Sequence, residues 1–271
     1  MAIDPTRFCI NRKIAPTLSL EAFFQLVQRL GLNKVELRND MPSGKVCDDL
    51  TVDQTRALLA KYSIDVVTIN AIYPFNRIDE ALLAKTDALL QEAQAIGAKA
   101  LVMCPLNDGV AVAPEETLAA MKNLAPRFAQ RDIEGLVEPL GFPVSSLRSA
   151  VQAQQLIRDA QVPFRLVIDT FHHHLYEHAE QEFPAEIDVS MIGLVHLSGV
   201  EDTRATAELT DEERIMLSNK DVLNSVAQVK RLEMLGYKGI YAFEPFSSEL
   251  NSWTPAEIER QIRHSIALLQ A

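Results

Sequence analysis

The sequence predicts a single-domain (β/α)8 barrel. Short β-rich runs alternate with longer helical patterns along the chain, which is typical of a parallel sheet with helical crossovers. The length of 271 residues fits one barrel of roughly 250 residues, and we expect it to span 1–271. A doubly wound open sheet is the competing architecture. The absence of a glycine-rich phosphate loop after any expected strand disfavours that sheet.

Eight strand–helix pairs follow one another along the chain. The expected strands lie near 7–11, 34–38, 65–70, 99–104, 133–138, 164–169, 192–197 and 239–244. The expected helices lie near 19–31, 53–62, 79–96, 114–130, 146–160, 173–182, 220–235 and 254–269. Because each strand is short and each crossover carries a helix, neighbouring strands should run parallel.

Several helix ends are marked by residue type. Thr51 precedes one expected helix, and Thr254 stands before Pro255 at the start of the last one, as is usual for a cap followed by a proline in the first turn. Glycine follows the last apolar position of three helices, at Gly31, Gly97 and Gly236. These glycines predict left-handed helix caps.

The composition excludes some classes of function. The net charge of −11 disfavours binding to nucleic-acid phosphates, which needs a basic surface. No apolar run approaches the roughly 20 residues needed to span a bilayer, and the first residues lack the apolar stretch of a secretory signal. Three cysteines without CxxC spacing, Cys9, Cys47 and Cys104, suit a reducing compartment. We therefore expect a cytoplasmic protein without membrane or nucleic-acid partners.

Four polar residues end four successive strands in the second half of the chain. They are Glu138, Asp169, His196 and Glu244. Strand ends converge on the mouth of a barrel, where active sites lie, and buried charges are costly without a partner. A charge facing solvent at the rim would explain any one of them, but four in sequence favour a shared cation. Three carboxylates and an imidazole suit Mn²⁺, Mg²⁺, Co²⁺ or Zn²⁺, so we predict one divalent metal ion.

Other polar residues end the earlier strands and should surround the same mouth. Asn11, Asn70 and Cys104 are expected at its polar rim rather than as metal ligands, and Asn70 is a candidate for substrate binding. Arg38 ends the second strand and has two interpretations. It either binds a substrate hydroxyl or pairs with Glu36.

Three consecutive histidines follow Asp169. Adjacent residues on a helix point in different directions, so the run cannot act as a single metal site. His172 lies one turn beyond Asp169, where it would contact a substrate or orient the metal ligands. His173 and His174 are expected at the protein surface, near a helix cap.

The longest irregular stretch runs from Ser198 to about Asn219. Long loops that follow barrel strands are commonly lids or binding loops. The alternative is a solvated acidic insertion with a short helix over Thr210–Leu217. The sequence leaves both interpretations open.

The strand-end residues resemble those of the xylose isomerase-like barrel superfamily, and the similarity covers nearly the whole chain. That superfamily includes sugar epimerases, hydroxypyruvate isomerase, inosose isomerases and dehydratases, and endonuclease IV. The C-terminal half is most similar to inosose (2-keto-myo-inositol) isomerase. The segments that carry this similarity are 169–174 (DTFHHH), 196–202 (HLSGVED), 209–215 (LTDEERI) and 235–246 (LGYKGIYAFEPF).

The resemblance implies roles for individual residues. Glu138, Asp169, His196 and Glu244 would bind the metal ion, and the two glutamates would also flank the substrate as an acid/base pair. His172 would hold a substrate oxygen. Arg214 matches a loop arginine that reaches the pocket in relatives. Those relatives often have a Pro-Gly-x-Gly turn after this arginine, whereas this chain reads MLSNKD over 216–221, which leaves the role of Arg214 open.

The function that the resemblance implies is isomerisation of an inosose, with the ketone moving to the adjacent carbon through a cis-enediol. A ketose epimerase, a hydroxypyruvate-type isomerase and an inosose dehydratase would use the same metal site. An apurinic endonuclease of the endonuclease IV type is disfavoured, since no histidine precedes His172 and the net charge is −11. A metal-free barrel acting as a scaffold is a third class. The expected partner is a small polyol-ketone or sugar, and a homodimer is an option because relatives commonly dimerise.

Overall fold

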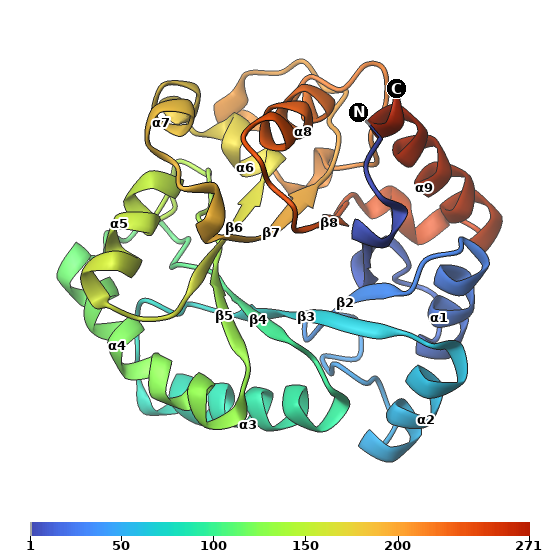
Figure 1. The fold of residues 1–271 in the computed structure, drawn as a ribbon, viewed down its shortest axis with the longest axis horizontal. Helices are drawn as coiled ribbons and strands as arrows, with labels where there is room; N and C mark the ends of the chain where they lie inside the picture. The colour runs from blue at the N-terminus through green and yellow to red at the C-terminus, as the bar shows by residue number, and fades with distance from the viewer. Residues whose placement is uncertain (1) are drawn as a thin grey trace.

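The computed structural model describes residues 2–271 and forms a closed barrel of eight parallel strands (Figure 1). The strands are β1 (Phe8–Asn11), β2 (Lys34–Arg38), β3 (Asp65–Ile72), β4 (Ala100–Met103), β5 (Glu134–Val137), β6 (Arg165–Asp169), β7 (Ile192–Leu197) and β8 (Ile240–Phe243). Each strand pairs in parallel with the next in the sequence, and β1 pairs with β8 to close the barrel. The predicted fold class is confirmed, and the open-sheet alternative is wrong.

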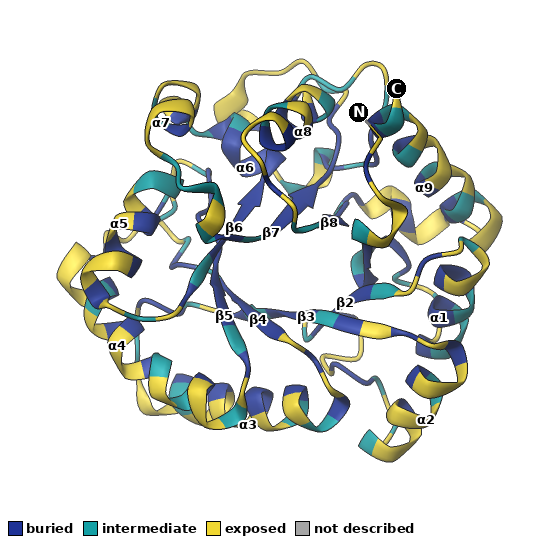
Figure 2. Cartoon of the chain, in the orientation of Figure 1, coloured by how far each residue is buried: buried dark blue, intermediate teal, exposed yellow. Residues whose placement is uncertain are grey.

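Helices surround the barrel and bury one face against it, as the burial pattern in Figure 2 shows. They are α1 (Leu20–Arg29), α2 (Val52–Tyr62), α3 (Glu80–Ile96), α4 (Pro114–Arg131), α5 (Ala150–Ala160), α6 (Thr170–Leu175), α7 (Ala179–Glu186), α8 (Ser225–Met234) and α9 (Pro255–Gln270). Short 3-10 turns lie at Pro5–Arg7, Arg12–Ile14, Val189–Met191, Thr206–Glu208, Asp211–Glu213 and Ser248–Ser252. No helix within residues 2–271 is long and apolar enough to cross a membrane.

The predicted helix ends are confirmed. The Thr51 side chain accepts a hydrogen bond from the backbone of Gln54, whose own side chain accepts from the backbone of Thr51. Thr254 caps α9 in the same position, with Pro255 in the first turn. The three predicted cap glycines, at positions 31, 97 and 236, have φ of +75°, +78° and +93°, a region that favours glycine.

One predicted helix is wrong in its extent. The stretch expected as a single helix over 173–182 forms two short helices, α6 and α7, separated at Tyr176. α6 begins directly after β6, because the Asp169 side chain caps it by accepting from the backbone N–H of Phe171. Tyr176 is extended, with φ −87° and ψ 112°, and this ends the helix. The early start puts His172 inside α6, next to the mouth of the barrel.

The barrel interior changes from apolar to polar along the strands. Inward-facing apolar residues form a small cluster of Cys9, Ala100, Val102, Leu136, Val167, Leu194 and Ala242. Side chains two positions apart on a strand point to the same face, so the residue two positions after each of these also faces inward. On β5 to β8 those next positions are Glu138, Asp169, His196 and Glu244. Strand alternation thus places these four side chains above an apolar floor.

Candidate metal centre and pocket

The four strand-end side chains converge. Glu138, Asp169, His196 and Glu244 are all buried, and each offers one ligand atom such that these atoms lie within 4.8 Å of one another. Asp169 ends β6, His196 lies in β7, and the two glutamates directly follow β5 and β8. The predicted convergence at the barrel mouth is therefore confirmed. Such a set of oxygen and nitrogen atoms could hold a divalent ion.

His196 lies at the centre of this cluster. Its Nδ1 is 2.8 Å from Glu138 Oε1 and 3.2 Å from Glu244 Oε2, and its Nε2 faces Glu36. Burial lowers the pKa of His196, but the charges of Glu244, Glu36 and Glu138 outweigh it and raise this pKa well above its usual range. The imidazole is thus surrounded by carboxylates on both sides.

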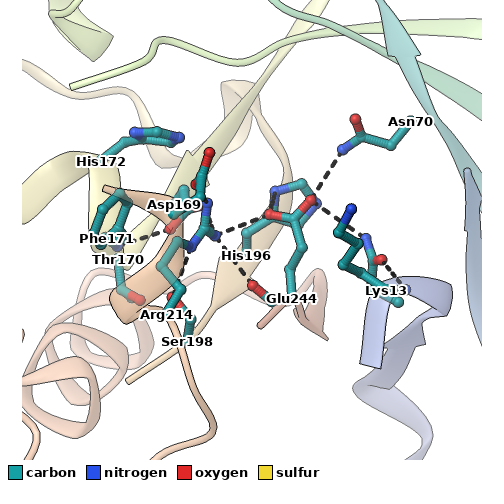
Figure 3. A network of polar contacts seen from close by, with 12 residues as sticks. Lys13, Asn70, Asp169, Thr170, Phe171, His172, His196, Ser198, Arg214 and Glu244 are labelled. Atoms are coloured by element: carbon teal, nitrogen blue, oxygen red, sulfur yellow. Dashed lines mark hydrogen bonds and ion pairs between the residues drawn. The ribbon is translucent and has the colours of Figure 1, made fainter. Parts of the chain in front are cut away.

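Arg214 reaches into the cluster from the long loop, as Figure 3 shows. Its Nη2 lies 2.6 Å from Asp169 Oδ2 and 3.0 Å from Glu244 Oε2. The guanidinium also packs over the rings of Phe171 and Phe246, at 4.8 and 4.5 Å from their centroids. Arg214 is only 1% exposed. The loop therefore contributes a buried cation to the mouth of the barrel, although it lacks the Pro-Gly-x-Gly turn that often follows this arginine in relatives.

The loop itself differs from the solvated insertion with a helix over 210–217. Only a 3-10 turn forms there, at Asp211–Glu213, capped by Thr210. The chain then returns to the barrel, where Ile215 pairs antiparallel with Gly199. The helix of that alternative does not form, because this pairing extends the backbone and turns Arg214 inward. A binding loop is the interpretation that this geometry favours.

Arg38 and two asparagines hold Glu244 from the other side. Arg38 Nη1 donates to Glu244 Oε1 over 2.6 Å, and its other nitrogens donate to Asp40 over 2.7 and 2.8 Å. Asn70 and Asn11 donate to the same Oε1 over 3.2 and 3.4 Å. The alternative that Arg38 pairs with Glu36 is wrong. Arg38 lies two residues further along β2 and is level with Glu244.

The two glutamates differ in how tightly they are held. Burial raises the pKa of Glu244, but His196, Arg214 and Arg38 lower it more, so its pKa lies below the usual range. Glu138 is contacted by His196 and by the Cys104 thiol, whose Sγ is 3.6 Å from Glu138 Oε2. Glu138 is thus the carboxylate with fewer donors.

The charge balance of the buried cluster fits a divalent cation. Four buried carboxylates, including Glu36, face two buried guanidiniums, those of Arg38 and Arg214. With His196 charged, as its raised pKa implies, three cations face four carboxylates. Release of the His196 proton on metal binding would leave two negative charges for the ion to balance. The strain is visible at Asp169, whose pKa is raised to about 7, mainly by burial, although Arg214 opposes the shift. A divalent ion among these oxygens would supply the missing charge.

A cavity of about 340 Å³ opens beside the cluster. Arg38, Asn70, Glu138, His172, Arg214 and Glu244 line it, together with apolar Leu140, Phe142 and Phe246. The structure thus brings every predicted substrate-binding residue to one cavity that also exposes the two glutamates. A volume of this order admits a small sugar-sized ligand.

His172 presents a hydrogen-bond donor to this cavity. Its Nδ1 accepts from the backbone N–H of Gly141 over 3.1 Å, and burial, Arg214 and His196 lower its pKa well below its usual range. The ring is therefore neutral and carries its proton on Nε2. His173 does not enter the cavity: it is buried and bonds to Glu180 at 2.7 Å and Arg231 at 3.0 Å, so the expected surface position is wrong for it.

Sequence reasoning missed Glu36 as part of the buried cluster. Its carboxylate is fully buried inside the barrel and contacts His196. The signal was available in the second strand, which reads KVELR over 34–38. Glu36 and Arg38 stand two positions apart and alternate with the apolar Val35 and Leu37, so both lie on the same face of the strand.

Comparisons with known proteins were consistent with this geometry. The family model described as xylose isomerase-like TIM barrel matches residues 24–271. A xylose isomerase domain containing protein from Salmonella typhimurium LT2 shares 65% identity over 100% of both chains, with a TM-score of 0.99. The IolI protein with a bound zinc atom has a TM-score of 0.85 at 19% identity, over 97% of this chain and 98% of that one.

A third solved structure with the same fold is D-allulose 3-epimerase from Methylomonas sp. in complex with D-allulose. It has a TM-score of 0.69 at 18% identity, over 97% of this chain and 98% of that one. At this identity the likeness concerns the fold alone. A search of curated proteins found no significant match.

Proposed function

The chain belongs to the xylose isomerase-like TIM barrel family, and from this premise we propose that it is a divalent-metal-dependent inosose isomerase. The enzyme would move the ketone of an inosose to the adjacent carbon. The observation that carries the proposal is the convergence of three buried carboxylates and one imidazole beside a cavity lined with hydrogen-bond donors. The zinc atom bound to the IolI protein, which shares this fold, also supports a metal ion in this chain.

The metal would be held by Glu138, Asp169, His196 and Glu244. When bound, a divalent ion supplies Lewis-acid stabilisation of the negative charge that develops on the substrate oxygens. The protein would supply the remaining parts of the reaction. These are binding of the hydroxyl groups, exclusion of water from the cavity and transfer of the proton.

Glu138 is the carboxylate that we assign to proton removal. It has two contacts, whereas Glu244 is held by Arg38, Arg214 and Asn70. Glu138 would take the proton from the hydroxyl-bearing carbon next to the carbonyl, which gives a cis-enediolate. Glu138 or Glu244 would return a proton to the former carbonyl carbon. The hydroxyl proton moves to the former carbonyl oxygen, so atoms and charge balance.

The substrate would be a small polyol-ketone or sugar held by donors around the cavity. Arg38, Asn70, His172 and Arg214 each place a nitrogen at its wall. Phe246 and Phe142 provide apolar faces for the C–H side of a ring. Such alternation of donors and aromatic faces suits a cyclic polyol.

The test is an assay of the purified, metal-stripped chain reconstituted with Mn²⁺, Mg²⁺, Co²⁺ or Zn²⁺. The substrates are myo-inosose, free ketoses and hydroxypyruvate, with products identified by NMR. A product in which the ketone of the inosose has moved to the adjacent ring carbon supports the proposal. Loss of water would indicate a dehydratase, an inverted carbinol centre in a ketose would indicate an epimerase, and failure to bind any divalent ion would indicate a scaffold.

The remaining expectations about partners stand as proposals. A small-molecule substrate, no nucleic acid and no membrane are proposed, in a cytoplasmic setting, with a homodimer as the assembly to test. Cleavage of DNA with an abasic site serves as the nuclease control. Light scattering after size-exclusion chromatography would measure the oligomeric state.

A further inference from the structure

A buried carboxylate that the proposed reaction does not use lies beneath the metal cluster. Glu36 is in β2 and is fully buried. In the barrel register it pairs with Asn11 of β1 and Thr68 of β3. Within residues 2–271 no lysine or arginine forms an ion pair with it, and its charged partner is His196. A buried carboxylate without strong donors would be costly, so these neighbours define what it does.

Every close polar neighbour of Glu36 is a hydrogen-bond donor. Asn11 Nδ2 and Thr68 Oγ1 donate to its two oxygens. His196 Nε2 lies 3.0 Å from Oε1 and 3.2 Å from Oε2. The carboxylate oxygens of Glu36 accept these hydrogen bonds, so the imidazole is the donor in the His196 contact and Nε2 carries its proton.

The proton on Nε2 determines what the other ring nitrogen can do. An imidazole that binds a metal ion is neutral and has one donor and one acceptor nitrogen, so retention of the proton on Nε2 would leave Nδ1 of His196 as the atom with a lone pair. That atom faces Glu138 Oε1 at 2.8 Å and Glu244 Oε2 at 3.2 Å. Once Nδ1 has lost its proton, it and these two carboxylate oxygens would be three acceptors that face one another, and this is where the proposed ion would bind.

We propose that Glu36 is a positioning residue that keeps the proton on Nε2 of His196 and thereby presents Nδ1 to the metal ion. The inference rests on the proposed metal site. β2 and β7 are not neighbours in the barrel, so the imidazole spans the interior and is held at both ends. Partners of this kind orient a ligand histidine, and their loss typically weakens metal affinity by about 10–100-fold.

The first test measures the affinity for Zn²⁺ of the wild-type chain and of Glu36→Gln by competition with a chelator. We expect the variant to bind Zn²⁺ about 10–100-fold more weakly. Glu233→Gln is the matched control, because Glu233 is also buried but lies in α8, outside the barrel, where it bonds to Arg7 and Tyr241. Equal affinity of Glu36→Gln and the wild type, or an equal loss in both variants, would overturn the inference.

The second test does not depend on how any variant folds. ¹⁵N-histidine NMR of the Zn²⁺-loaded wild-type chain would report the proton on Nε2 of His196 and the metal on Nδ1. Metal on Nε2 contradicts the inference. A wild-type chain that binds Zn²⁺ through Nδ1 but is inactive on every substrate refutes the proposed function and leaves the inference intact, so the two failures are distinguishable.

Discussion

Arg214 donates a 2.6 Å hydrogen bond to Asp169, although the two residues lie 45 positions apart in the sequence. The same nitrogen is 3.0 Å from Glu244. A loop cation is therefore buried against two of the four proposed metal ligands.

Replacing Arg214 by Gln should destabilise the metal-free protein. Loss of one partner of a buried ion pair costs about 3–5 kcal/mol, because Asp169 and Glu244 would be left buried without the cation that they share. Added Mn²⁺ supplies positive charge at the same place, so the rise in melting temperature on adding Mn²⁺ should be larger in Arg214→Gln than in the wild type. Differential scanning fluorimetry measures both quantities. Arg204→Gln, in the exposed part of the same loop, is the control and should change stability by less than about 0.5 kcal/mol.

Glu138→Gln and Glu244→Gln should both lower turnover by at least about 100-fold, the usual contribution of a general base. They should differ in stability. Glu244→Gln leaves Arg38 and Arg214 without their shared carboxylate, so its midpoint in urea should fall more than that of Glu138→Gln. Glu134→Gln is the control. Glu134 lies at the opposite end of β5 and pairs with Arg165, so this variant should retain wild-type turnover. If Glu138→Gln or Glu244→Gln keeps near-native activity, the assignment of that glutamate to the acid/base pair is wrong.

Gly199→Ala should displace the loop that carries Arg214. A Cβ at this position would meet the backbone oxygen of Met216 at 2.5 Å, so the pairing with Ile215 must shift. We expect a loss of about 1–3 kcal/mol in stability and a fall in kcat/KM for the proposed substrate. Thr206→Ala, at an exposed site in the same loop, should leave both unchanged. An active Gly199→Ala variant would show that the loop position is unimportant.

The contribution of His173 to stability should fall as the pH drops below about 6.5. Burial is the main cause that lowers the pKa of His173 below its ordinary value of 6.5, with Arg231 adding to the effect and Glu180 opposing it. Below pH 6.5, His173 binds a proton in the unfolded chain but stays neutral in the folded protein, so acid favours unfolding through this group. The contribution of one such group is about 1.4 kcal/mol per pH unit. Urea titrations from pH 7.5 to 5.5 should show a smaller decline for His173→Gln, and an identical decline would contradict the assignment.

The fold and the convergence of the four candidate ligands could be predicted because both depend on local patterns. The strands over 34–38 and 192–197 have the predicted bounds, and the four ligands stand at strand ends that any closed parallel barrel brings together. The helix over 173–182 was wrong because Asp169 caps α6 as soon as β6 ends. Helical pattern alone does not reveal a cap supplied by a residue that also ends a strand.

The sequence by itself determined which side chains face the barrel interior, since alternation along a strand is a property of the backbone. It therefore determined that Glu138, Asp169, His196 and Glu244 meet above an apolar floor. Only the tertiary structure decided that Arg214 turns inward to Asp169 and that His196 reaches Glu36 across the interior. Those contacts join a loop to a strand and two strands that are not neighbours, so they depend on the closure of the barrel and the path of the loop, which no local pattern encodes.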